Sequence, residues 1–77
     1  MYRYNIDIHL RNGNKFFITT ESFAGSATIY LAKLLSNENE DFIIVDDIYT
    51  DMVYCVAKEE IEAITCLQIK EGRCNEE

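Results

Sequence analysis

The chain has 77 residues, and its 14 acidic residues outnumber its 7 Lys and Arg residues, giving a formal net charge of −7 at pH 7. Hydrophobic residues make up 48% of the chain, which is typical of a globular protein and argues against a disordered one. Direct binding to DNA or RNA is not expected, because an acidic surface repels phosphate backbones. The negative charge favours a partner protein with a basic face. The alternative is that the charge only keeps this small protein soluble.

The length favours one domain, which we expect to span residues 1–71, with residues 72–77 as a frayed polar tail. No apolar run approaches the roughly 20 residues that a membrane-spanning helix needs. The first five residues alternate between apolar and polar side chains and lack the apolar stretch of a signal peptide. We therefore expect a cytoplasmic protein that does not contact membranes.

The first twenty residues predict a β-hairpin. Residues 2–10 alternate strictly between apolar and polar side chains, and a period of two indicates a strand with one buried face. Residues 11–14 read Arg-Asn-Gly-Asn, which is a turn signal, and residues 15–20 form a second apolar run.

The length of the hairpin loop can be predicted from the pattern. A three-residue loop over residues 11–13 places Ile8 opposite Phe16 and Ile6 opposite Ile18, so that apolar side chains share one face. It also places Gly13 where a type I turn followed by a bulge requires a left-handed residue. We prefer this loop to a two-residue turn, because a slip of one residue would turn one strand's apolar set outward.

Residues 23–36 predict the helix of this chain. Ser22 is a candidate N-cap, while Gly25 weakens the first turn and favours a start nearer Ser26. Residues 36–40 are polar and end the helix. The apolar stripe expected to cover the sheet consists of Phe23, Ala27, Tyr30, Leu31, Leu34 and Leu35.

Two further strands are predicted in the next segment. The segment 41–45 consists of Asp41 followed by a continuous apolar run. Such a run is typical of a strand buried on both faces. Asp46 and Asp47 favour a tight turn, and residues 48–57 alternate as a strand. After a turn at 58–60, residues 62–69 favour a final strand, with a helix over 58–68 as the alternative.

These elements predict an α+β fold of order β-β-α-β-β-β, with an antiparallel sheet of four to five strands and one helix on one face. One helix covers one face of a sheet, yet Phe17, Ile43, Val45, Ile64 and Cys66 are expected on the opposite face. Exposed apolar patches of this kind indicate an interface. We therefore predict self-association as a dimer through Phe17, Ile43 and Val45, or else a sheet that curls into a small barrel.

Catalytic chemistry is not indicated. His9 is the only histidine, and Asp7 lies two residues before it on the same strand face. A general base needs a nucleophile or a bound water within reach, whereas polar residues at alternate positions are also what the outer face of a strand carries. The chain lacks a phosphate-binding glycine motif and a nucleophile elbow. We predict that it is not an enzyme and that it binds no cofactor.

A metal site is not indicated either. Asp46, Asp47 and Asp51 place three carboxylates close together, and carboxylates are ligands that Ca²⁺ prefers. Their spacing lacks the glycine and the terminal glutamate of an EF-hand loop, so we interpret Asp46 and Asp47 as residues that cap a hairpin turn.

The three cysteines form no Cys-x-x-Cys pair. Cys55 and Cys66 lie in apolar runs and are expected in the core. Cys74 is expected to be an exposed thiol in the tail.

The hairpin, the short helix, the run Asp-Phe-Ile-Ile-Val-Asp-Asp at residues 41–47 and the closing Ile-rich strand resemble small acidic proteins of phages and mobile elements in low-GC Gram-positive bacteria. Some of those proteins are anti-CRISPR or other anti-defence inhibitors. The resemblance rests on size, charge and element order, and it implies an inhibitor that acts in the host cytoplasm.

We therefore expect a non-enzymatic inhibitor that binds a basic, nucleic-acid-binding surface of a host defence protein, its carboxylates mimicking phosphates. The alternative is a homo-oligomeric sponge or scaffold that binds a small ligand between subunits. The acids expected to contact a basic partner are Glu38, Glu40, Asp41, Asp46, Asp47, Glu59, Glu60 and Glu62.

Overall fold

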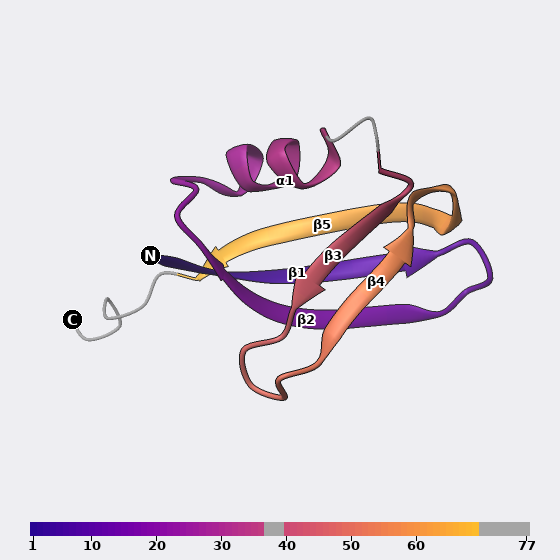
Figure 1. Cartoon of the computed structure of the whole chain (residues 1–77), viewed down its shortest axis with the longest axis horizontal. Coiled ribbons are helices and arrows are strands. Elements are labelled where there is room, and N and C mark those ends of the chain that lie inside the picture. Colours follow the sequence, from indigo (N-terminus) through magenta and orange to yellow (C-terminus); the bar gives the residue numbers. More distant parts are fainter. Residues whose placement is uncertain (37–39, 70–77) are drawn as a thin grey trace.

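The computed structural model describes residues 1–36 and 40–69. Within these ranges the chain forms two antiparallel sheets and one α-helix, which confirms the α+β class (Figure 1). The elements are β1 (Tyr2–Leu10), β2 (Lys15–Ser22), α1 (Ala27–Leu35), β3 (Phe42–Asp46), β4 (Val53–Ala57), the short 3-10 helix η1 (Lys58–Glu60) and β5 (Ile61–Ile69).

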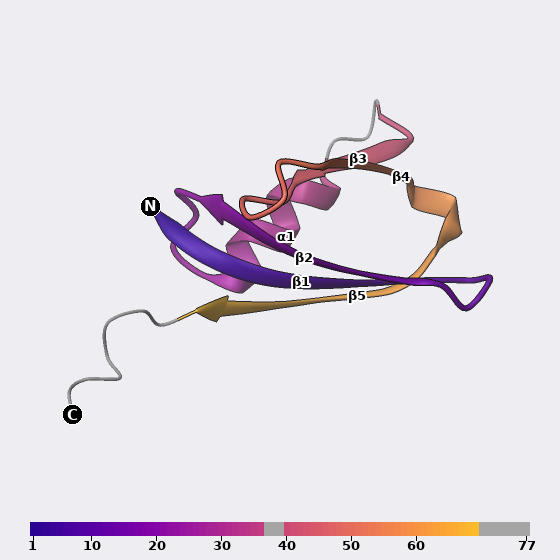
Figure 2. The same ribbon diagram turned by 90° about the horizontal axis from the view of Figure 1, so that it is seen from below.

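The predicted single sheet of four to five strands is divided in two. Three strands pair in the order β2-β1-β5, and β3 pairs with β4 in a separate sheet. Seen edge-on, the three-stranded sheet is one layer, and α1 and the β3–β4 hairpin both lie on the same side of it (Figure 2). The main buried cluster joins both layers and contains Ile6, Ile8, Ile18, Ile43, Val45 and Val56.

The predicted register of the first hairpin is confirmed. Ile8 pairs with Phe16 and Ile6 with Ile18. The loop is closed by the Gly13 amide, which donates to the Leu10 carbonyl at 3.0 Å. Gly13 has a φ of 93°, a conformation that a residue without a Cβ adopts at little steric cost.

The helix begins at Ala27, as the weakened turn at Gly25 suggested, and not at residue 23. Ser26 is its N-cap, and its hydroxyl accepts a hydrogen bond from the Ile29 amide at 3.2 Å. Phe23 lies outside the helix and is exposed. Within the predicted stripe, Tyr30 and Leu34 are half-buried and pack against the core, Leu31 is half-buried as well, and Leu35 is exposed.

A tyrosine pair joins the helix to the sheet. Tyr4 is fully buried on β1, and its hydroxyl donates to the carbonyl of Ala24 in the segment before α1. Its ring stacks on Tyr30 of α1, with 5.1 Å between the ring centroids. Because one side chain contacts both the helix and the segment that precedes it, the position of α1 over the sheet is fixed at this point.

The prediction that residues 41–45 are buried on both faces is wrong. Ile43 and Val45 are 1% and 2% exposed, while Phe42 and Ile44 are 49% and 59% exposed. The strand lies in the outer layer, so alternate side chains point into the core and away from it. Ile43 and Val45 are therefore core residues and not part of a self-association surface. Phe17 does lie exposed, on the outer face of the three-stranded sheet.

The connection between β3 and β4 is longer than predicted, because residues 48–52 do not belong to a strand. The Asp47 carboxylate accepts hydrogen bonds from the amides of Tyr49 and Thr50, at 2.8 and 3.2 Å. Asp51 has a φ of 61°, a left-handed conformation that Asp tolerates better than most residues. The turn interpretation of Asp47 is confirmed, whereas Asp46 ends the strand, and Asp51 lies in the turn and not in the predicted strand over residues 48–57.

The final segment is a strand, and the helical alternative over 58–68 is excluded. β5 pairs with β1, so that Ile64 lies opposite Ile8 and Cys66 opposite Ile6. Ile64 and Cys66 therefore face the core and not the outer face, which corrects the prediction. The tail at 72–77, with Cys74, lies outside the described residues.

Candidate protein-binding surface

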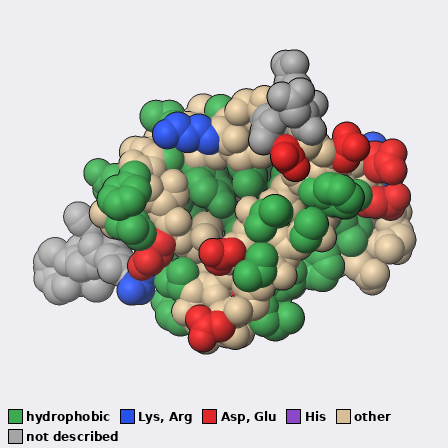
Figure 3. Space-filling view, viewed as in Figure 1, with side chains coloured by type: hydrophobic (Ala, Val, Ile, Leu, Met, Phe, Trp, Pro, Cys, Tyr) green, Lys and Arg blue, Asp and Glu red, His purple; other side chains and the backbone are tan. Residues whose placement is uncertain are grey.

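The outward side of the β3–β4 sheet is apolar and exposed. Phe42 and Ile44 on β3 point away from the core, as do Val53 and Cys55 on β4, and Ile44 pairs with Cys55. We call these four residues the hairpin face. Figure 3 shows hydrophobic side chains gathered over β3 and β4 on this side of the molecule. A cluster of large exposed apolar side chains on one sheet is typical of a binding surface.

The turn between the two strands extends this apolar surface. Tyr49 and Met52 are both exposed. Tyr49 is held in place by Arg3, whose guanidinium donates to the tyrosine hydroxyl at 3.2 Å and lies 6.0 Å from the ring centroid. Arg3 also pairs with Glu21 at 3.3 Å. The turn is thus tied to the three-stranded sheet.

Acidic residues gather at the opposite end of the hairpin. The Lys58 amide donates to the Asp41 carbonyl at 2.8 Å, which places η1 beside the start of β3. Glu40, Asp41, Glu59 and Glu60 are exposed there, and we call these four residues the acidic end. A hollow of about 400 Å³ joins it to the hairpin face. The hollow is lined by Asp41, Phe42, Ala57, Lys58 and Glu59.

The carboxylates of the acidic end make no hydrogen bond or ion pair within residues 1–36 and 40–69. Arg11 binds the backbone of η1 and not its carboxylates. The Arg11 side chain donates to the Glu59 carbonyl at 2.8 Å, and the Arg11 amide donates to the Glu60 carbonyl at 2.9 Å. These bonds fix η1 against the first hairpin, and the Glu59 and Glu60 side chains are exposed.

The remaining predicted contact residues are not grouped with the acidic end. Asp46 is exposed at the far end of β3. Asp47 is 8% exposed and its carboxylate caps the turn, so it belongs to the framework and not to a binding surface. Glu62 is exposed at a register shift in β5, where Ile61 and Ala63 pair with β1 and Glu62 does not. Glu38 lies outside the described residues.

The polar residues considered for chemistry lie elsewhere. Asp7 and His9 share the outer face of β1, where His9 pairs with Lys15 of β2. Among the described residues, no group of three or more His, Cys, Asp or Glu side chains is arranged to hold a metal ion. Cys66 packs against the core, where burial raises the pKa of its thiol. Cys55 is exposed on the hairpin face, which corrects its predicted core position.

Comparison with known proteins gives no family for this chain: no family model, no curated protein and no solved structure matches it. Within the described ranges, no helix has the length and apolar character needed to cross a bilayer. The candidate surface therefore rests on its geometry and charge.

Sequence reasoning missed the hairpin face. Phe42, Ile43 and Ile44 are consecutive apolar residues, and such a run does not indicate which alternate side chains point outward. The available signal was β4, in which Val53, Cys55 and Ala57 alternate with Tyr54 and Val56. Only one side of a two-stranded hairpin can face the core. When both sides carry apolar side chains, one apolar side is therefore left exposed.

Proposed function

We propose that this protein is a non-enzymatic binding protein, and that the hairpin face and the acidic end together bind a protein with basic residues around an apolar patch. The observation that carries the proposal is that the exposed apolar hairpin face lies directly beside the acidic end, whose carboxylates have no partner within the described ranges. Apolar burial would supply affinity at the centre of such an interface, and charge would guide association at its rim.

Charge favours a basic partner over a second copy of this chain. Residues 40–60 contain seven acidic residues, and Lys58 is their single basic residue. Two copies that met through the hairpin face would bring these acids together, and like charges across an interface oppose association. The homo-oligomeric sponge is less well supported, because two of its three proposed contact residues, Ile43 and Val45, are buried in the core.

The resemblance to small acidic phage proteins extends the proposal to a class of partner. We propose a host defence protein with a basic nucleic-acid-binding groove, in which the acidic end occupies positions that phosphates would otherwise take. An Arg- or Lys-lined groove with an apolar floor matches both parts of the surface.

The experiment begins with affinity capture from a lysate of a low-GC Gram-positive bacterium, followed by association kinetics with the purified partner across a salt series. The double variant Asp41→Asn, Glu59→Gln should slow association about several-fold at low salt, because it removes two rim charges. Ile44→Ser should mainly raise the dissociation rate, because it removes apolar contact area.

The matched control is the double variant Thr28→Lys, Ala32→Lys, in which two exposed residues of α1 change the net charge by the same amount. It should associate nearly as fast as the unmodified protein. An acidic partner, binding that is indifferent to salt and to the substitutions, or an equal loss in the control would overturn the proposal.

A further inference from the structure

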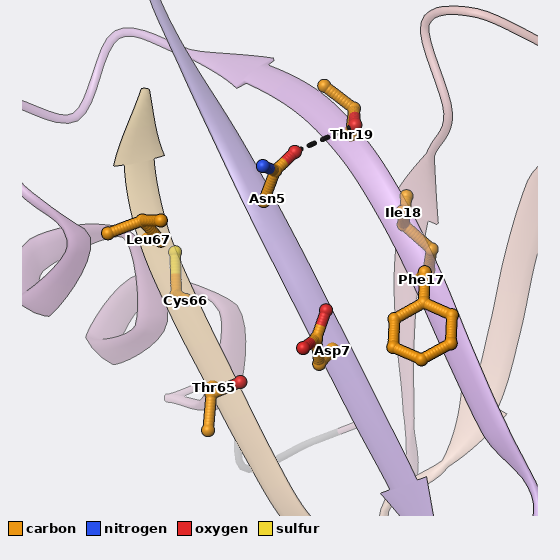
Figure 4. A pocket seen from close by; sticks show the side chains of 8 residues that line it. All are labelled: Asn5, Asp7, Phe17, Ile18, Thr19, Thr65, Cys66 and Leu67. Atoms are coloured by element: carbon orange, nitrogen blue, oxygen red, sulfur yellow. Dashed lines mark hydrogen bonds between the residues drawn. The ribbon is translucent and has the colours of Figure 1, made fainter. Parts of the chain in front are cut away.

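A second hollow lies on the opposite side of the molecule, on the outer face of the three-stranded sheet. It has a volume of about 410 Å³, within the range of sites that accept small groups. We call it the outer trough. It is lined by the outward-facing residues Asn5, Asp7, Phe17, Thr19, Thr65 and Leu67, together with Ile18 and Cys66, whose side chains face the core (Figure 4).

The floor of the outer trough carries an unpaired carboxylate. Asp7 lies on the middle strand β1, opposite Phe17 on β2 and Thr65 on β5. It makes no hydrogen bond or ion pair within residues 1–36 and 40–69. Phe17 and Leu67 stand on the two flanking strands and are about two-thirds exposed, at 65% and 66%. The Asp7 carboxylate thus lies between Phe17 and the polar Thr65, while Leu67 lies opposite Asn5, two residues along β1.

Asn5 adds a hydrogen-bond donor to the same floor. Its side-chain oxygen accepts a hydrogen bond from the Thr19 hydroxyl at 2.8 Å, and its amide nitrogen lies on the side away from Thr19 (Figure 4). Asn5 and Asp7 are two residues apart on one strand face, a spacing of about 7 Å. The trough therefore presents a donor and an anionic acceptor in line along β1.

We propose that the outer trough binds an arginine side chain of an extended protein segment. The guanidinium group would donate to Asp7 while its plane lies against the Phe17 ring, and the peptide carbonyl of the same residue would accept from the Asn5 amide. Arginine suits this geometry better than lysine, because a planar guanidinium stacks on an aromatic ring and donates in its own plane at the same time.

Among the residues that the structure describes, the charges around the trough leave the Asp7 carboxylate open. Arg3 and Glu21 pair with each other, and Lys15 lies beside His9 in the register without contacting Asp7. The proposal does not rest on the hairpin face or the acidic end, since those surfaces lie on the other layer.

The test is a titration of the isotope-labelled protein with N-acetyl-arginine-methylamide, followed by the amide resonances in two-dimensional NMR spectra. We expect saturable shifts at Asp7, Phe17 and Thr65, with a dissociation constant on the order of millimolar, because one side chain buries little surface. The neutral analogue N-acetyl-citrulline-methylamide, which has nearly the same shape, should bind at least about tenfold more weakly, because it lacks the charge.

Variants locate the binding. Asp7→Asn should weaken binding of the arginine derivative at least about tenfold, and Phe17→Leu should weaken it several-fold while keeping an apolar wall. Asp46→Asn, which removes a carboxylate from the other layer, should leave binding unchanged. Both trough substitutions are at solvent-accessible positions, and unchanged spectra of the core amides would show that the fold is intact.

Three results would overturn the proposal. The first is equal binding of the arginine and citrulline derivatives, and the second is an equal loss in Asp46→Asn, which would indicate non-specific attraction to a net negative protein. The third is a concentration-dependent shift of the trough amides without ligand, which would assign this face to contact between two copies of the chain.

Discussion

At the scale of single residues, Gly13 and Gly25 allow the effect of backbone strain to be measured apart from the effect of steric clashes. A Cβ built on Gly13 or on Gly25 meets no atom within 4 Å, but only Gly13 has a positive φ, of 93°. Gly13→Val should therefore lower the free energy of unfolding by about 1–3 kcal/mol, through backbone strain alone. Urea unfolding followed by circular dichroism measures the change.

Gly25→Ala is the matched control, and it should be neutral or stabilising by up to about 1 kcal/mol, because it restricts the unfolded chain without straining the folded one. Equal destabilisation by both substitutions would show that the left-handed turn is not what requires glycine at residue 13.

Tyr30 gives the folded protein a dependence on alkaline pH. Burial, with the charge of ionised Cys66 as a smaller cause, raises the pKa of Tyr30 from 10.0 to about 12. The unfolded chain therefore loses this proton at lower pH than the folded chain does. The stability contributed by Tyr30 is fully present below pH 10 and is lost as the pH rises toward 12.

We expect the urea midpoint to fall between pH 10 and 12, and the fall to be smaller in Tyr30→Phe. Part of the fall should persist in this variant, because the pKa values of Tyr4 and Cys66 are also raised by burial. A midpoint with the same pH dependence in both proteins would contradict the assignment to Tyr30.

At the scale of elements, β3 offers a direct comparison of its two sides. Ile43 is fully buried, and the adjacent Ile44 points outward. Ile43→Ala should lower the free energy of unfolding by about 2–5 kcal/mol, because it leaves a cavity in the core. Ile44→Ala should change it by no more than about 0.5 kcal/mol. Chemical denaturation of both variants checks the pair, and similar losses would mean that the hairpin face is covered in the free protein.

The first hairpin could be predicted in register because its determinants are local. Alternation over residues 2–10 and a glycine at the turn define one pairing that keeps Ile6 and Ile8 on the buried side. The local sequence does not fix the start of α1, because Ser22 and Ser26 can each act as an N-cap. The choice between them depends on where Tyr4 holds the preceding segment.

The β3–β4 hairpin could not be predicted to the same extent. Ile43 and Ile44 are chemically identical neighbours, and their opposite roles follow from the hairpin packing over the three-stranded sheet. That arrangement depends on contacts between distant residues and not on a local pattern. The acids near Asp41 and Glu59 were expected at one end of the fold, but the apolar face beside them became visible only with the layers in place.

At the scale of the whole molecule, the two sheets share one core but keep separate hydrogen-bond ladders. Within residues 1–36 and 40–69, two backbone hydrogen bonds link the β3–β4 hairpin and its flanking segments to the first hairpin. The Ile48 amide donates to the Thr19 carbonyl at 2.8 Å, and the Arg11 amide donates to the Glu60 carbonyl at 2.9 Å. By contrast, β1 is paired along both of its edges.

This division should appear as two levels of protection in amide hydrogen exchange, because segments with few backbone links to the rest of a fold open at lower free energy than the whole. Amides of β1 should exchange only on global unfolding, and those of β3 and β4 should exchange faster through local opening. Uniform protection across both sheets would show a single cooperative unit. If the hairpin does open alone, the surface proposed to bind a partner is carried on the part of the molecule that can most readily change its shape to fit.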